Sequence, residues 1–206
     1  MSARHRASII TDAREFASRG WLLGTCGNLS ARTSPDQFIV TASGRDKGRL
    51  TPDDFILCDL DAQPLGEPVP GLKPSAETLL HAAIYRRFPD VGAVYHVHDV
   101  HAALCSHRDE ALGHTALADV EMIKGLGVWD EGAAIQIPIL ANPAHIPELA
   151  MLVEAFLAQR GDSASVPAVN ILRHGTYAWG ADCFAAKRHT DSLGYLFEYA
   201  WKVGAR

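Results

Sequence analysis

Two histidines that alternate along an apolar segment are the clearest chemical feature of the sequence. His96 and His98 end the segment from Val91 to His98, whose β-branched and aromatic residues are typical of a buried strand. Side chains two positions apart on a strand share a face, and their backbones lie roughly 6.6 Å apart. Two imidazoles at that spacing can bind one cation, with each nitrogen about 2.0–2.1 Å from a zinc ion. The pair therefore indicates a metal site, although hydrogen-bonded strand histidines fit the same spacing.

A third histidine strengthens this interpretation. His174 follows the apolar segment from Val166 to Leu172 and precedes Gly175, where the backbone must turn. At the end of a strand a side chain can leave the core and enter a cleft. Three histidines with an open fourth position form a catalytic metal site, and imidazole accepts several divalent metals. The alternative is a turn histidine beside two structural ones. His101 is expected to be a helix residue and not a fourth ligand.

Two glutamates could supply a carboxylate to such a site. Glu77 follows Ser75 at the expected start of a helix, where the backbone dipole already favours an acid. A carboxylate there could also act as a base or as a displaceable fourth ligand. Glu121 lies in the segment from Asp119 to Gly125, and its local sequence indicates only a surface acid.

Three short segments could bind an anion through backbone amides or short polar side chains. They are Cys26-Gly27-Asn28, Ser43-Gly44 with Arg45 and Lys47 nearby, and Ser75. Free N–H groups at a helix start such as Ser75 attract negative charge. Each segment alone is a common turn or cap, so only their convergence in the fold would make a phosphate site.

The composition limits the partners of the chain. Hydrophobic residues make up 48% and charged residues 21% of 206 residues, the balance of an ordinary soluble globular protein. The net charge of −5 argues against a nucleic-acid or membrane partner. The four cysteines form no C-x-x-C pair, and no apolar run near the start suits a signal peptide, so we expect a reducing, cytoplasmic setting. Neither a G-x-G-x-x-G nor a Walker-type loop is present, so nucleotide-binding classes have little support.

Periodicity and turn signals predict interleaved helices and strands. Helices are expected at residues 8–19, 75–87, 100–108, 146–160 and 184–202, and strands at 28–32, 37–41, 55–59, 91–98, 134–140, 166–172 and 176–180. Many of the strands follow one another through short turns. This order favours a mixed or mostly antiparallel sheet covered by helices over a doubly wound parallel one.

Five short motifs in one order carry a resemblance to a known family. They are Gly27-Asn28-Leu29-Ser30, Thr41-Ala42-Ser43-Gly44, Lys73-Pro74-Ser75-Ala76-Glu77, Tyr95-His96-Val97-His98 and Arg173-His174-Gly175. Together they resemble the class II aldolase/adducin family over nearly the whole chain. The segments Glu121 to Gly125 and His174 to Gly180 are most similar to the dehydratases of that family.

The resemblance implies an α/β fold in which a mostly antiparallel mixed sheet forms the middle of a three-layer α/β/α domain spanning residues 1–206. It also implies a homotetramer and zinc held by His96, His98 and His174. Family aldolases often carry a glutamate beside the metal at the position of Glu77, where some dehydratases carry cysteine. The dehydratases use the position of Glu121 as acid/base. Asn28, Ser43, Gly44 and Ser75 match positions that hold the substrate phosphate.

The resemblance to these dehydratases implies the dehydration of 5-methylthioribulose 1-phosphate to 2,3-diketo-5-methylthiopentyl 1-phosphate. A class II sugar-phosphate aldolase or epimerase acting on a fuculose, rhamnulose or ribulose phosphate is the alternative enzyme, because it would use the same metal and phosphate sites. A non-enzymatic, adducin-like scaffold is a third reading. It predicts loss of the metal ligands, whereas all three histidines are present.

Overall fold

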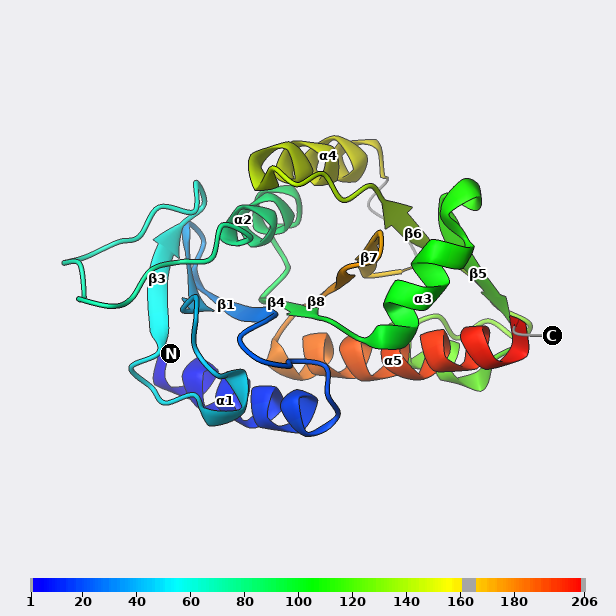
Figure 1. The fold of residues 1–206 in the computed structure, drawn as a ribbon, viewed down its shortest axis with the longest axis horizontal. Helices are drawn as coiled ribbons and strands as arrows, with labels where there is room; N and C mark the ends of the chain where they lie inside the picture. Colours follow the sequence, from blue (N-terminus) through cyan, green and yellow to red (C-terminus); the bar gives the residue numbers. More distant parts are fainter. Residues whose placement is uncertain (1, 161–165, 205–206) are drawn as a thin grey trace.

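An eight-stranded sheet forms the centre of the computed structural model, which describes residues 2–160 and 166–204 (Figure 1). The strands are β1 (Asn28–Ser34), β2 (Gln37–Thr41), β3 (Phe55–Asp59), β4 (Ala93–Val97), β5 (His114–Ala118), β6 (Ala134–Leu140), β7 (Ala168–Ile171) and β8 (Gly175–Gly180). The helices are α1 (Ser2–Ser18), α2 (Thr78–Arg87), α3 (Val100–Arg108), α4 (Ile146–Gln159) and α5 (Cys183–Gly204), with 3₁₀ helices η1 (Lys47–Arg49), η2 (Glu110–Leu112) and η3 (Glu121–Leu126).

The strand order brings together segments that are far apart in the chain. It runs β3-β2-β1-β4-β8-β7-β6-β5, and every neighbouring pair is antiparallel except β6 and β7. The predicted mixed, mostly antiparallel sheet is confirmed. Because β4 lies between β1 and β8, Asn28 and Tyr177 both pair in register with His96.

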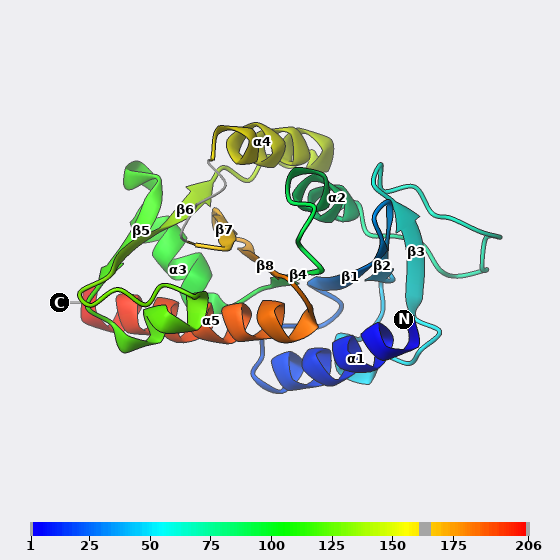
Figure 2. The ribbon, with the colours of Figure 1, turned by 180° about the vertical axis from the view of Figure 1, so that it is seen from behind.

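Helices cover both faces of the sheet (Figures 1 and 2). One face packs on α2 and α4 in a core that includes Val94 and Tyr177. The other packs on α1 around Tyr95 and Val97, and on α3, η3 and α5 further along the sheet. Since side chains alternate along a strand, His96 shares the face of Val94, on the side of α2. The predicted three-layer α/β/α arrangement is confirmed.

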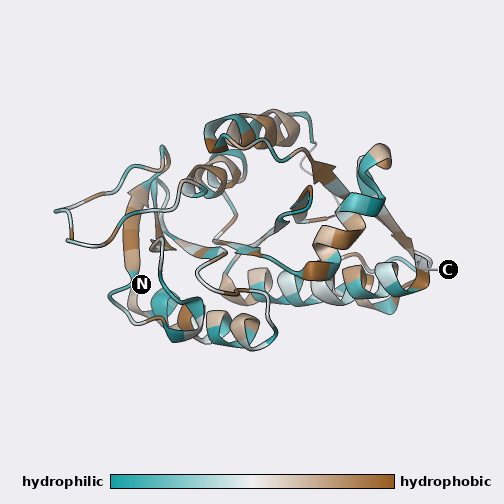
Figure 3. Ribbon diagram, viewed as in Figure 1, coloured by the Kyte–Doolittle hydropathy of each residue, from teal (hydrophilic) through white to brown (hydrophobic). Residues whose placement is uncertain are grey.

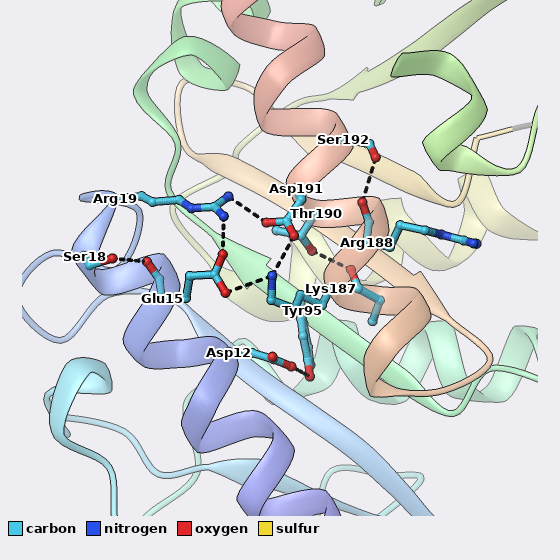
Figure 4. A network of polar contacts seen from close by, with 11 residues as sticks. Asp12, Glu15, Ser18, Arg19, Tyr95, Lys187, Arg188, Thr190, Asp191 and Ser192 are labelled. Atoms are coloured by element: carbon cyan, nitrogen blue, oxygen red, sulfur yellow. Dashed lines mark hydrogen bonds and ion pairs between the residues drawn. The ribbon is translucent and has the colours of Figure 1, made fainter. Parts of the chain in front are cut away.

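Burial of apolar strand residues drives this layering, and Figure 3 shows hydrophobic colour running along strands such as β3 and β6. A polar network then fixes α1 against α5 (Figure 4). Lys187 of α5 pairs with Glu15 of α1 and with Asp191, at 3.0 and 2.7 Å. The Tyr95 hydroxyl donates to Asp12 at 2.6 Å, and burial raises the pKa of that carboxyl. These contacts therefore hold α1 against α5 and against the face of β4 that carries Tyr95.

Most element positions agree with the sequence patterns, and the differences lie mainly at element ends. The first helix begins at Ser2, six residues earlier than predicted, and α2 begins at Thr78 because Ser75 precedes it in a turn. Strand β5 was not predicted, since its five residues at the sheet edge bury only two side chains. Among the described helices none is long and apolar enough to cross a membrane.

Candidate metal centre

Four side chains from three separate parts of the chain converge at the end of β4. Glu77, His96, His98 and His174 each offer one ligand atom, and these atoms all lie within 4.8 Å of one another. The three imidazole rings are mutually adjacent, with centroids 4.6–5.0 Å apart. The fold thus brings together the three histidines predicted to bind a metal, and it adds the carboxylate of Glu77.

His96 is the most buried member of the group, and its surroundings fix the ring. Tyr177 of β8 stacks on it at a centroid distance of 4.0 Å and an interplanar angle of 9°. Its Nδ1 donates to the backbone carbonyl of Thr176 at 3.2 Å, which leaves Nε2 unprotonated and facing the other ligands. Burial keeps the pKa of His96 well below its usual value, so the ring is neutral.

The separation of His96 from His98 tests whether a metal fits. Their Nε2 atoms lie 3.0 Å apart, so in the metal-free chain a neutral His98 donates its Nε2–H to Nε2 of His96, and a bound cation would take the place of that hydrogen. Burial lowers the pKa of His98 to about 4, so the ring carries no positive charge at neutral pH that would repel a metal ion. Two nitrogens on one tetrahedral zinc lie roughly 3.3 Å apart. The group therefore fits a divalent cation.

A tight turn between β7 and β8 aims His174 at this cluster. Arg173 adopts a positive φ of 54°, and its backbone N–H donates to Ser106 of α3 at 2.8 Å. Gly175 follows because β8 passes very close to β4. A Cβ on Gly175 would lie 2.3 Å from the carbonyl oxygen of Val97 and 3.2 Å from the ring of His96. The glycine is thus needed for the histidines to meet.

We expect Gly175→Ala to reduce metal binding at least tenfold and to lower stability by roughly 1–3 kcal/mol, because β8 must move away from β4. Metal titration of the chelated protein and urea unfolding measure the two effects. Gly113→Ala is the control. Its φ of 70° makes a side chain there strained, so stability should fall, but a Cβ meets nothing within 4 Å and metal affinity should not change. Unchanged metal affinity in Gly175→Ala would contradict this account of the turn.

Glu77 directs one carboxylate oxygen toward the histidines and the other away from them. Its Oε1 lies 3.1 Å from Nε2 of His174 and 3.8 Å from Nε2 of His96, while Oε2 accepts from Asn28 Nδ2 at 2.7 Å. Burial alone would raise the pKa of Glu77. The hydrogen bonds from His174 and Asn28 outweigh it and hold the pKa well below its usual range. The group is therefore an anion facing a cation site.

Behind Glu77 a chain of buried hydrogen bonds runs into the core. His81 Nε2 lies 2.5 Å from the Asn28 Oδ1, and its Nδ1 lies 2.7 Å from the Ser30 hydroxyl, which is 2.8 Å from the hydroxyl of Tyr85. The amide of Asn28 donates to Glu77, so its oxygen accepts from His81, and Ser30 must donate to the other nitrogen of that ring. Every bond is thus polarised toward the carboxylate.

His81 predicts a specific acid sensitivity. Burial lowers its pKa to about 3, whereas the unfolded chain binds this proton near pH 6.5. The stability it contributes is fully present above pH 6.5 and is lost as the pH falls toward 3. Metal-free His81→Gln should therefore lose about 2 kcal/mol less stability than the wild type between pH 7 and pH 5 in urea unfolding.

The matched control is His145→Gln, because the same substitution there removes an exposed ring. Equal pH dependence in the wild type and in His81→Gln would contradict a neutral, buried His81.

A cavity of about 120 Å³ opens beside the metal group. Glu77 and His98 line it together with three of the predicted phosphate residues, Asn28, Ser43 and Ser75. Gly44 belongs to the same turn, with a φ of 71°, and does not line the cavity. One of the two Nδ2–H groups of Asn28 donates to Glu77 and is therefore not available to a ligand in the cavity. The segments that looked like separate turns and caps in the sequence do converge.

A family model described as the Class II Aldolase and Adducin N-terminal domain matches residues 7–201. The chain belongs to the class II aldolase/adducin family.

Proteins from several bacteria are similar in sequence to this chain. The methylthioribulose-1-phosphate dehydratase of Geobacillus kaustophilus is 43% identical over 191 residues, covering 92% of this chain and 86% of that protein. The Bacillus subtilis protein of the same name is 42% identical over 192 residues, with 92% and 88% covered. Among solved structures, L-fuculose-1-phosphate aldolase from Thermus thermophilus aligns with a TM-score of 0.70 at 25% identity, covering 97% of this chain and 96% of that one.

Within this class II aldolase fold, Glu121 lies apart from the metal group. It begins η3, which packs on α5, whereas Glu77 and His96 lie on the α2 side of the sheet. About 85% of its side chain is exposed, and it forms an ion pair with Lys124 at 2.7 Å. It lines a different cavity, of about 480 Å³, that contains none of the four metal-group residues. One copy of the chain does not bring Glu121 to the histidines.

Several residues around the site escaped the sequence patterns. His81 lies four positions after Glu77, so the helical period alone places both on one face of α2. Tyr177 lies three positions after His174, but only the register of β8 against β4 stacks it on His96. The sequence places Lys47 only near the possible anion-binding turn at Ser43-Gly44, whereas the structure shows that it is buried and lines the cavity beside Glu77.

Proposed function

We propose that this chain is a methylthioribulose-1-phosphate dehydratase, a cytoplasmic lyase of methionine salvage. It would remove water from 5-methylthioribulose 1-phosphate to give 2,3-diketo-5-methylthiopentyl 1-phosphate. The two relatives of this name compared above are 43% and 42% identical over most of the chain. The observation that carries the proposal is the meeting of three imidazoles, a carboxylate and a small polar cavity at the end of β4.

His96, His98 and His174 would hold the metal, which we take to be zinc, although imidazole also accepts other divalent ions. A bound cation of this kind acts as a Lewis acid that polarises a carbonyl oxygen. Glu77 is proposed as a fourth, displaceable ligand or as a base. Its Oε1 faces the histidines, and the bond from Asn28 to Oε2 prevents the carboxylate from turning away.

The cavity beside the metal group suits the phosphate of the substrate. Asn28, Ser43, Gly44 and Ser75 are proposed to bind it through side-chain groups and backbone N–H groups. The cavity adjoins Glu77 and His98, so an anchored phosphate would hold the sugar carbons against the metal group. Fixing the substrate at a point away from the reacting carbons orients it without taking part in the chemistry.

Glu121 is proposed as the acid/base: its carboxylate would take up the C3 proton and return it to the departing C4 hydroxyl, which leaves as water. Because Glu121 lies on the other side of the sheet from the metal group of its own chain, we propose that it serves the site of a neighbouring copy. A homotetramer with head-to-tail contacts would repeat this arrangement around a ring. The high exposure of Glu121 in the single chain agrees with that placement.

A substrate comparison tests the proposed reaction. Purified zinc-loaded protein is incubated with methylthioribulose 1-phosphate and, separately, with fuculose and ribulose phosphates. We expect a diketone from the first and no aldehyde fragments or epimer from the others, because the proposed acid/base eliminates a hydroxyl and cleaves no C–C bond. Aldehyde fragments or an epimer from the other sugars would instead favour the aldolase or epimerase alternative.

Subunit mixing tests the role of Glu121. Glu121→Gln should abolish dehydration while leaving the metal content intact, and His96→Ala should abolish it by removing a metal ligand. If Glu121 acts on a neighbouring copy, mixed oligomers of the two inactive variants recover activity at about a quarter of their sites. No recovery from verified mixed oligomers would contradict action across subunits, and full activity of Glu121→Gln would contradict its role altogether.

A further inference from the structure

Lys47 is a buried cation in the wall of the cavity beside the metal group. Its exposed fraction is 1%, and it lines the cavity together with Asn28, Ser43 and Ser75. Lysine is rarely buried to this degree unless its charge is compensated. The charge of Lys47 therefore requires an explanation.

The backbone around Lys47 holds its ammonium group in place. Asp46 caps η1 by accepting from the N–H of Gly48 at 2.9 Å. Gly48 in turn packs tightly on α1, because a Cβ at this position would lie 3.2 Å from the Cβ of Ala17. The Nζ atom donates to the carbonyl oxygens of Thr25 and Arg45 at 3.1 and 2.9 Å. An ammonium has three N–H donors, and within residues 2–160 and 166–204 the third has no acceptor.

No carboxylate in the described part of the chain lies within 4.0 Å of Lys47 Nζ. The neighbouring cation differs, because Arg45 pairs with Asp54 at 3.2 Å and is partly exposed. Burial lowers the pKa of Lys47, while the more distant charges of Cys26, Glu77, Asp46 and Asp54 act against that change. A bound anion within reach of Nζ would supply both the missing acceptor and the missing charge.

We infer that Lys47 binds the phosphate of the substrate, as the cation among otherwise uncharged donors on that wall of the cavity. The assignment rests on the proposed function in taking the substrate to be a phosphate ester. It adds a charged contact to amides and hydroxyls, and charge-assisted hydrogen bonds are about twice as strong as neutral ones. A net charge of −5 is no obstacle, because the cation is local to the cavity.

The test uses zinc-loaded Lys47→Met, in which a side chain of similar length lacks the charge. We expect KM for methylthioribulose 1-phosphate to rise about 10- to 100-fold while kcat changes little, and competitive inhibition by inorganic phosphate to weaken by a similar factor. Arg49→Met is the matched control, because Arg49 lies on the same η1 and its side chain is 88% exposed. Equal phosphate inhibition in Lys47→Met and wild type would overturn the inference.

A crystal structure of the wild-type zinc protein with inorganic phosphate decides the matter if Lys47→Met does not fold. Phosphate oxygen within hydrogen-bonding distance of Lys47 Nζ supports the assignment, and phosphate bound elsewhere or absent overturns it. The results distinguish the proposed function from the proposed role of Lys47. If the wild type binds phosphate through Lys47 but does not dehydrate the substrate, only the proposed function is contradicted. If Lys47→Met dehydrates the substrate as the wild type does, only the proposed role of Lys47 is contradicted.

Discussion

The close approach of imidazole nitrogens at the end of β4 is the constraint on which the site depends. His96 and His98 present Nε2 atoms 3.0 Å apart in surroundings that disfavour protonation, and Glu77 adds a carboxylate oxygen. Neutral imidazole nitrogens and a carboxylate oxygen held this close together can direct their lone pairs at one divalent cation. The fold therefore assembles the ligand set before a metal is present, and metal binding would then add to the stability of the folded state.

The surrounding residues fix the orientation of these ligands. Stacking by Tyr177 and the bond to the Thr176 carbonyl fix one ring, and the hydrogen bonds through His81 and Asn28 fix the carboxylate. Each of these hydrogen bonds has a defined donor and acceptor, so the network orients the Glu77 carboxylate. A site held this way reaches its binding geometry before any ligand arrives.

The sheet order explains why the metal group and the phosphate cavity are neighbours. Strands β1 and β8 flank β4, so the loop before β1 and the turn before β8 meet at the end that carries His98. The turn after β2 and the start of α2 complete the cavity wall. Glu121 belongs to the opposite layer and faces solvent, so the chemistry proposed for this class II aldolase fold requires a second copy of the chain.

The sequence by itself determined the fold class, the family, most of the strands and helices and the three histidines, because period-2 and period-3.6 patterns and short ordered motifs are local signals. Only the tertiary structure decided which residues share the site. The pairing of Asn28 with Glu77, the stacking of Tyr177, the burial of Lys47 and the separation of Glu121 all follow from strand register and layer packing. These features depend on contacts between residues that are remote in the chain, so no local pattern in the sequence encodes them.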